Sequence, residues 1–107
     1  MIFYDSRRTF APYRRHDNEI SRGMVCDMLS HAMAHGKTGC AWVTVQTHIT
    51  AVAIAAQCSM ACIIWPDGIA ADMPSAERAE HEGIAVICSP LSAYEIAGIM
   101  HEAGIQA

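Results

Sequence analysis

Runs of consecutive apolar residues alternate with segments of helical periodicity from residue 19 to the end of the chain. Three runs, residues 40–45, 61–65 and 84–88, are short and are bounded by glycine or polar residues. Short, continuously apolar runs are typical of parallel strands buried on both faces. A fourth segment, residues 22–26, fits either a strand or an extended lead-in. The pattern therefore predicts three strands and leaves the fourth segment open.

Four segments carry an apolar stripe with the period of an α-helix. They are a helix that follows Asp27, a helix over residues 48–57, a helix from Met73 to Gly83, and a helix from Ser92 to about Glu102. The second is apolar on almost every side, so we expect it to pack closely against the sheet. On the fourth, Ile96, Ile99 and Met100 form the predicted buried side.

The predicted helix ends carry residues that satisfy free backbone groups. Side chains of Asp, Thr and Ser accept hydrogen bonds from the N–H groups of a first turn, and glycine favours the end of a helix. The predicted N-caps are Asp27, Thr47, Asp72 and Ser92, and the predicted stops are Gly36, Gly83 and Gly104. Ser92 and Glu95 have the spacing of a capping box.

Strands that alternate with helices along the chain predict an α/β fold. We expect three layers: a short, mainly parallel sheet with helices on both faces. The chain has 107 residues, which is typical of one domain. Residues 1–18 are polar, rich in arginine and without a clear period, so they are predicted to be a weakly ordered N-terminal arm; residues 19–107 are predicted to form the domain.

The composition predicts a surface that is covered by a partner. Hydrophobic residues make up 52% of the chain and charged residues only 17%, below the usual quarter. We therefore expect a homodimer, with apolar faces around Met24, Met28 and Met60 contributing to association.

Charge and cysteine content predict the compartment and exclude some partners. The net charge is -4, and the acidic residues lie mainly after residue 18, which argues against a nucleic-acid-binding surface. The apolar stretch 49–65 is interrupted by polar residues and changes its period, so we predict a helix and a strand and no membrane span. Five cysteines among apolar neighbours, and no secretory signal, predict a cytoplasmic protein.

Ligands of parallel sheets gather beyond the carboxyl ends of the strands. Three turns are predicted to meet at this edge, and the first helix start there offers free N–H groups to an anion. The candidate ligand-binding residues are Thr44, Gln46, Thr47, His48, Asp67, Gly68 and Ser92. The alternative interpretation is that Thr47 and Ser92 only cap helices and that the others only shape turns.

Motifs for catalysis and metal binding are weak. Gly36-Lys37-Thr38 lacks the earlier glycine and the strand–helix context of a phosphate loop, and no nucleophile elbow is present. His31 and His35 share a helix face without a second pair of ligands. We therefore expect no metal, no cofactor and no enzymatic activity. The alternative is a small enzyme that uses His48 and Asp67 as acid and base.

Residues 27–105 resemble a DRTGG domain, a small α/β module related to the N-terminal domain of HPr kinase/phosphorylase. An ordered set of segments carries the resemblance: Cys26-Asp27-Met28-Leu29-Ser30, Trp42-Val43-Thr44-Val45-Gln46-Thr47-His48, Ala51-Val52-Ala53, Cys62-Ile63-Ile64-Trp65-Pro66-Asp67-Gly68, Glu82-Gly83-Ile84-Ala85-Val86-Ile87 and Leu91-Ser92-Ala93-Tyr94-Glu95-Ile96. The family's Asp-Arg pair is replaced by Gln46-Thr47 or Thr47-His48, and its Thr-Gly-Gly turn by Pro66-Asp67-Gly68. The resemblance is therefore to a divergent, stand-alone member.

The resemblance implies a regulatory role. DRTGG domains are attached to enzymes such as phosphate acetyltransferases and nucleotide-regulated pyrophosphatases, and they resemble dimerisation or ligand-sensing modules. The leading hypothesis is a non-catalytic regulatory or interaction module that forms a homodimer or binds a protein partner. The second hypothesis is a sensor that binds a small molecule, nucleotide or other anion at the carboxyl edge of the sheet.

Overall fold

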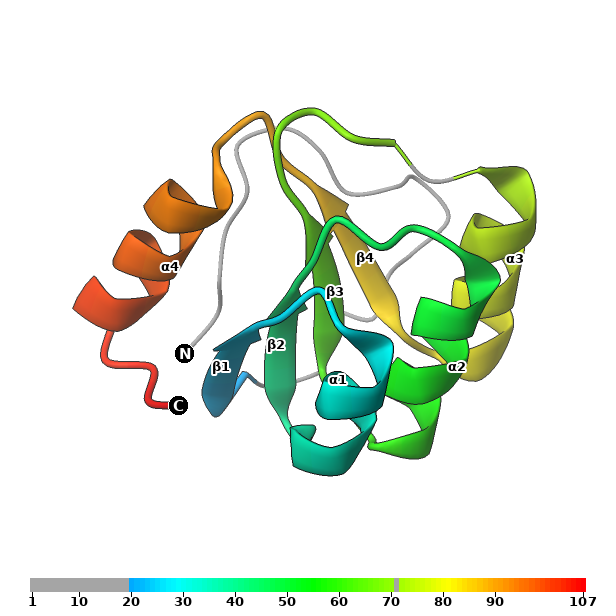
Figure 1. Ribbon diagram of the computed structural model, residues 1–107, viewed down its shortest axis with the longest axis horizontal. Coiled ribbons are helices and arrows are strands. Elements are labelled where there is room, and N and C mark those ends of the chain that lie inside the picture. The colour runs from blue at the N-terminus through cyan, green and yellow to red at the C-terminus, as the bar shows by residue number, and fades with distance from the viewer. Residues whose placement is uncertain (1–19, 71) are drawn as a thin grey trace.

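The computed structural model describes residues 20–70 and 72–107, so the predicted arm over residues 1–18 lies outside the described residues. Strands and helices alternate along the chain (Figure 1). The elements are β1 Arg22–Val25, α1 Leu29–His35, β2 Cys40–Val43, α2 Ile49–Gln57, β3 Cys62–Trp65, α3 Met73–Glu82, β4 Ala85–Cys88 and α4 Ala93–Glu102. The open segment at residues 22–26 is thus a strand.

The four strands form one parallel sheet in the order β1-β2-β3-β4. Val25 is opposite Val43 across the first pair, and Ile63 is opposite Val86 across the last. Gln106 forms an isolated parallel bridge with Arg22, which places the end of the chain beside β1. The predicted parallel α/β fold is confirmed.

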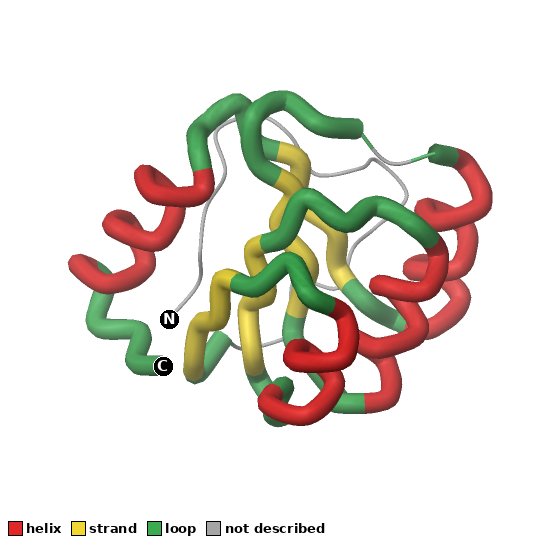
Figure 2. Tube along the Cα trace, in the orientation of Figure 1, coloured by secondary structure: helices red, strands yellow, loops and turns green. Residues whose placement is uncertain are grey.

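Helices cover both faces of the sheet, as predicted. Helices α1, α2 and α3 lie together on one face, and α4 lies on the other (Figure 2). Each of the first three connections steps in the same direction across the sheet, and right-handed crossovers then place all three helices on the same side. Helix α4 follows the last strand and returns across the opposite face to contact β1 and β2.

Alternate residues of β2, β3 and β4 enter two separate apolar clusters, because successive side chains of a strand point to opposite faces. The cluster under α1, α2 and α3 contains Trp42, Ile63 and Trp65, and the cluster under α4 contains Val43 and Ile64. These five side chains are completely buried. Helix α2 contacts both α1 and α3, which explains why it is apolar on almost every side.

The predicted association residues divide between core and surface. Met60 is only 3% exposed and belongs to the core, so its predicted role in association is wrong. Its side chain lies close to Gly36, where an added Cβ would also come within 2.9 Å of the Ala32 carbonyl oxygen. Met24 is partly buried against the same core, whereas Met28 is 65% exposed.

Two of the four predicted N-caps are confirmed. The carboxylate of Asp72 accepts a hydrogen bond from the Ser75 N–H, and Ser92 forms the predicted capping box. The predictions for Asp27 and Thr47 are wrong, since Met28 and His48 occupy the cap positions of α1 and α2. Both of these helices follow loops whose polar groups are bonded across the sheet edge, and these longer-range bonds determine where each helix begins.

Candidate functional site

The loops that follow the strands meet at the carboxyl edge of the sheet, as the sequence predicts (Figure 1). Backbone hydrogen bonds join neighbouring loops directly. The Thr44 N–H donates to the Ile64 carbonyl oxygen at 3.1 Å. The N–H groups of Asp67 and Gly68 donate to the carbonyl oxygens of Leu91 and Ser89 at 2.8 and 2.9 Å. The bond of Thr44 joins the loop after β2 to strand β3, and the bonds of Asp67 and Gly68 join the loop after β3 to the loop after β4.

Asp27 is the centre of a polar network at the β1–β2 side of this edge. One carboxylate oxygen accepts hydrogen bonds from the Thr44 hydroxyl at 3.0 Å and the Val45 N–H at 2.9 Å. The Thr44 hydroxyl also accepts from the Gln46 N–H, and the Gln46 side-chain amide donates to the Asp27 carbonyl oxygen. Two predicted ligand-binding residues, Thr44 and Gln46, therefore hold two loops together, and Asp27 was missed as their partner.

Two buried tryptophans form hydrogen bonds with the backbone of the same loops. The Trp42 indole N–H donates to the Cys26 carbonyl oxygen at 2.8 Å, and the Trp65 indole N–H donates to the Gln46 carbonyl oxygen at 2.8 Å. A buried indole that finds a backbone acceptor fixes the position of the loop that carries it. The β1–β2 side of the edge is consequently tied to the core.

Thr47 and His48 are occupied at the start of α2. The imidazole Nδ1 of His48 accepts from the Thr50 N–H at 3.1 Å, so His48 is itself the cap. The backbone oxygen of Thr47 accepts from the Ser75 hydroxyl at 2.7 Å, which joins this loop to α3. In the tautomer that accepts this bond, the ring proton is on Nε2.

Asp67 and Gly68 form an exposed turn in which both residues have positive φ, at 61° and 72°. No hydrogen bond or ion pair joins the side chains of His48 and Asp67 within the described part of the chain. His48 instead affects the carboxyl group of Asp72. Hydrogen bonds from Ser75 lower the pKa of Asp72, and the nearby His48 lowers it further.

Ser92 is committed to its helix. Its hydroxyl accepts from the Glu95 N–H at 3.1 Å, and the Glu95 carboxylate accepts from the Ser92 N–H at 2.9 Å. This reciprocal pair is the predicted capping box, so the interpretation of Ser92 as a structural cap is supported by its contacts.

The cysteines form no disulfide, and two of them are deeply buried. Burial raises the pKa of Cys40 to about 11 and that of Cys62 to about 12, so neither thiol ionises readily. Across residues 20–70 and 72–107, no three His, Cys, Asp or Glu side chains gather as ligands of a metal ion. His31 and His35 instead stack, with ring centroids 4.1 Å apart.

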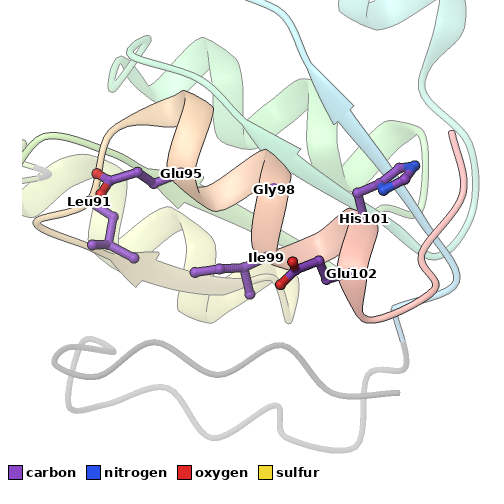
Figure 3. Close-up of a pocket in the computed structure, with 6 residues that line it drawn as sticks. All are labelled: Leu91, Glu95, Gly98, Ile99, His101 and Glu102. Atoms are coloured by element: carbon purple, nitrogen blue, oxygen red, sulfur yellow. The ribbon is translucent and has the colours of Figure 1, made fainter.

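A hollow of about 530 Å³ lies on the outward side of α4 (Figure 3). It is lined by Leu91, Glu95, Gly98, Ile99, His101 and Glu102. The helical pattern did not predict this hollow, because it places Ile99 on the buried side of the helix. That prediction is wrong, since Ile99 is 41% exposed. A signal was present in Gly98, which lies inside a helical pattern.

Within residues 20–70 and 72–107, no helix has the length and apolar character required to span a membrane.

Comparison with known proteins gives a likeness in fold. No family model matches the chain, and no curated protein matches it. A solved structure of similar fold is that of the CBS and DRTGG domains of the regulatory region of Clostridium perfringens pyrophosphatase, complexed with its activator diadenosine tetraphosphate. The TM-score is 0.64 at 14% identity, over 78% of this chain and 40% of that one. The chain therefore spans less than half of the structure whose fold it shares.

Proposed function

We propose that this domain is a non-catalytic regulatory module that acts by associating with a second copy of itself. The observation that carries this proposal is the contrast between polar and apolar groups at the surface. The hydroxyl and amide groups at the β1–β2 edge are bonded to one another. Large apolar side chains are exposed instead: Val25, Met28, Met33, Val45, Met73, Tyr94 and Ile99. Such side chains on a small domain favour an interaction surface.

The likeness to the pyrophosphatase regulatory region supports a regulatory role and a DRTGG-type domain. At 14% identity this support concerns the fold, so the role itself rests on the surface of this chain. The ordered segments that resemble DRTGG domains include β2, β3 and β4 and the loops that follow them at the carboxyl edge.

Light scattering after size-exclusion chromatography tests the proposal. The full chain is measured from low micromolar to millimolar concentration, and we expect its mass to rise from that of one chain to that of two. A single-chain mass at every concentration contradicts the proposal. A dimer that does not dissociate on dilution agrees with it.

A second candidate function is binding of a nucleotide at the carboxyl edge, which is favoured by the nucleotide activator bound in the structure of similar fold. At this edge, the groups without a hydrogen-bonding partner among residues 20–70 and 72–107 include the Nε2 of His48, the hydroxyl of Thr47 and the exposed carboxylate of Asp67. A carboxylate repels phosphates, so Asp67 would accept hydrogen bonds from ribose or base groups of such a ligand.

A thermal-shift series separates the two functions. Diadenosine tetraphosphate, AMP, ATP and inorganic phosphate are each added to the full chain, because a ligand that binds only the folded state raises the melting temperature. For nucleotide binding, we expect a shift that Asp67→Ala abolishes and the exposed α3 control Glu77→Ala retains. No shift with any of these compounds contradicts the second function.

A further inference from the structure

The outward face of α4 contains a glycine that the described part of its own chain does not require. Gly98 is exposed in the middle of the ten-residue helix, and a Cβ added there would meet nothing within 4 Å. Glycine inside a helix is less stable than alanine, because it loses more conformational freedom on folding. Among residues 20–70 and 72–107, nothing occupies the space over Gly98.

The side chains around Gly98 are arranged on two chemically different flanks. Each residue of an α-helix is rotated by about 100° from the one before it. Tyr94 and His101 therefore lie on one flank of Gly98, and Glu95 and Glu102 lie on the other. Ile96 and Met100 are on the opposite side of the helix, where both are buried against the sheet. Figure 3 shows Gly98 between Glu95 near the start of the helix and Glu102 near its end.

The two flanks are complementary to each other. Carboxylates accept hydrogen bonds, whereas the tyrosine hydroxyl and the imidazole N–H donate them. A surface that carries both halves of a complementary pair is what a two-fold interface requires, because the same patch is contributed by both copies. This argues for a second copy of this chain as the occupant rather than an unrelated partner.

Symmetry then determines the direction of the helices. When two α4 helices face each other in antiparallel orientation, equal flanks meet, and the carboxylates of Glu95 and Glu102 lie opposite carboxylates. When the helices are parallel, opposite flanks meet, and Glu102 faces the His101 side chain of the second copy while Glu95 faces its Tyr94. Like charges opposite each other disfavour the antiparallel arrangement.

From these observations we propose that two copies of this chain associate through parallel α4 helices that cross at Gly98. This inference rests on the proposed function and specifies its surface. Gly98 allows the two helix backbones to approach closely. Tyr94, which is 88% exposed, supplies a large aromatic contact of the kind that dominates interface energies. Leu91 and Ile99 add apolar surface along the hollow.

The first test is the substitution Gly98→Gln in the full chain, with dimer dissociation measured by sedimentation velocity. The new side chain has room in the monomer but blocks the approach of a second helix. We expect dissociation to become easier by about 30-fold or more, the range of an interface hot spot. The matched control is Ala34→Gln at an exposed position of α1, which should leave dissociation unchanged.

The second test concerns the flanks. His101→Glu places carboxylates on both sides of the parallel pair and should weaken the dimer. Combining His101→Glu with Glu102→His exchanges the two flanks and should restore association. A merely structural effect of His101→Glu would not be reversed by the second substitution, so this rescue tests the contact itself.

The third test concerns direction. With Glu102→Cys, which keeps Tyr94 in place, a short bismaleimide should join position 102 of one copy to position 102 of the other only in the parallel arrangement, because the antiparallel one places these positions at opposite ends of the pair. Mass spectrometry of the digested product identifies the joined peptides and separates them from those of the five native cysteines.

The outcomes separate this inference from the proposed function. A dimer that Gly98→Gln leaves intact overturns the α4 interface, while the proposed association stands. The same conclusion follows if Met28→Gln breaks the dimer and Gly98→Gln does not. A wild-type chain that stays monomeric overturns both. Loss of the dimer in Gly98→Gln, together with cross-linking at position 102, supports the parallel α4 pair.

Discussion

The carboxyl edge of the sheet and the outward face of α4 differ in what their polar groups contact. At the edge, Thr44, Gln46 and Asp27 bond to each other and to backbone groups. On α4, Tyr94 and His101 point away from the core and have no hydrogen-bonding partner among residues 20–70 and 72–107. A cluster of polar residues in the sequence is therefore a weaker sign of a binding site than a group without an internal partner.

The largest expected effect belongs to the core beneath the edge. Trp65→Ala should destabilise the fold by about 3–5 kcal/mol, because it removes a fully buried indole and its bond to the Gln46 carbonyl oxygen. Urea unfolding followed by far-ultraviolet circular dichroism measures this change. A cost below about 1 kcal/mol would show that the edge is not held by this residue.

A smaller effect is expected within the polar network. Thr44→Val should cost about 1–3 kcal/mol, because the buried hydroxyl both donates to Asp27 and accepts from Gln46. The matched substitution Thr47→Val removes a hydroxyl that has no bonded partner within the described residues, and should change stability by no more than about 0.5 kcal/mol. Equal effects in denaturant unfolding would contradict the assignment of Thr44 to the network.

On α4 the expected change has the opposite sign. Gly98→Ala should stabilise the monomer by about 0.5–1 kcal/mol, because alanine favours the helix and its methyl group meets no neighbour in the described part of the chain. Unfolding at a concentration low enough to keep the chain monomeric measures this gain. Destabilisation would mean that Gly98 serves the packing of its own chain, contrary to the open space seen here.

The smallest effect is expected at the Asp72 cap and depends on pH. The folded-state pKa of Asp72 lies below its ordinary value of 3.8, so the ionised carboxylate stabilises the fold above that pH. This stabilisation is lost as the pH falls from 3.8 through the lowered folded-state pKa. Comparing Asp72→Asn with wild type at pH 7 and in this acid range should show the wild-type advantage only at the higher pH.

The periodicity of the chain was sufficient to predict the α/β class, the positions of three strands along the sequence and the four helices of the described residues. The apolar run before Thr44 and the stripe of Ile96 and Met100 report burial directly, and burial is what builds the layers. The pattern did not decide whether residues 22–26 form a strand, because β1 is an edge strand whose residues are only partly buried.

Local contacts were also predictable. Asp72 and Ser92 cap helices through partners three residues away, and Gly83 ends α3 with a positive φ of 76°. Distances of this kind are fixed by the helix itself, so the sequence spacing is enough to identify them.

The sequence by itself determined the α/β class, the apolar strands β2, β3 and β4, and the helix ends that Asp72, Ser92 and Gly83 satisfy through near neighbours. Only the tertiary structure decided the role of Asp27, which bonds to Thr44 and Val45 from a different strand end, and the exposure of Ile99 and Gly98 on α4. The hydrophobic periodicity of a segment describes the burial of one helix or strand at a time. The partner of a side chain depends on how separate elements are brought together, which no local pattern records.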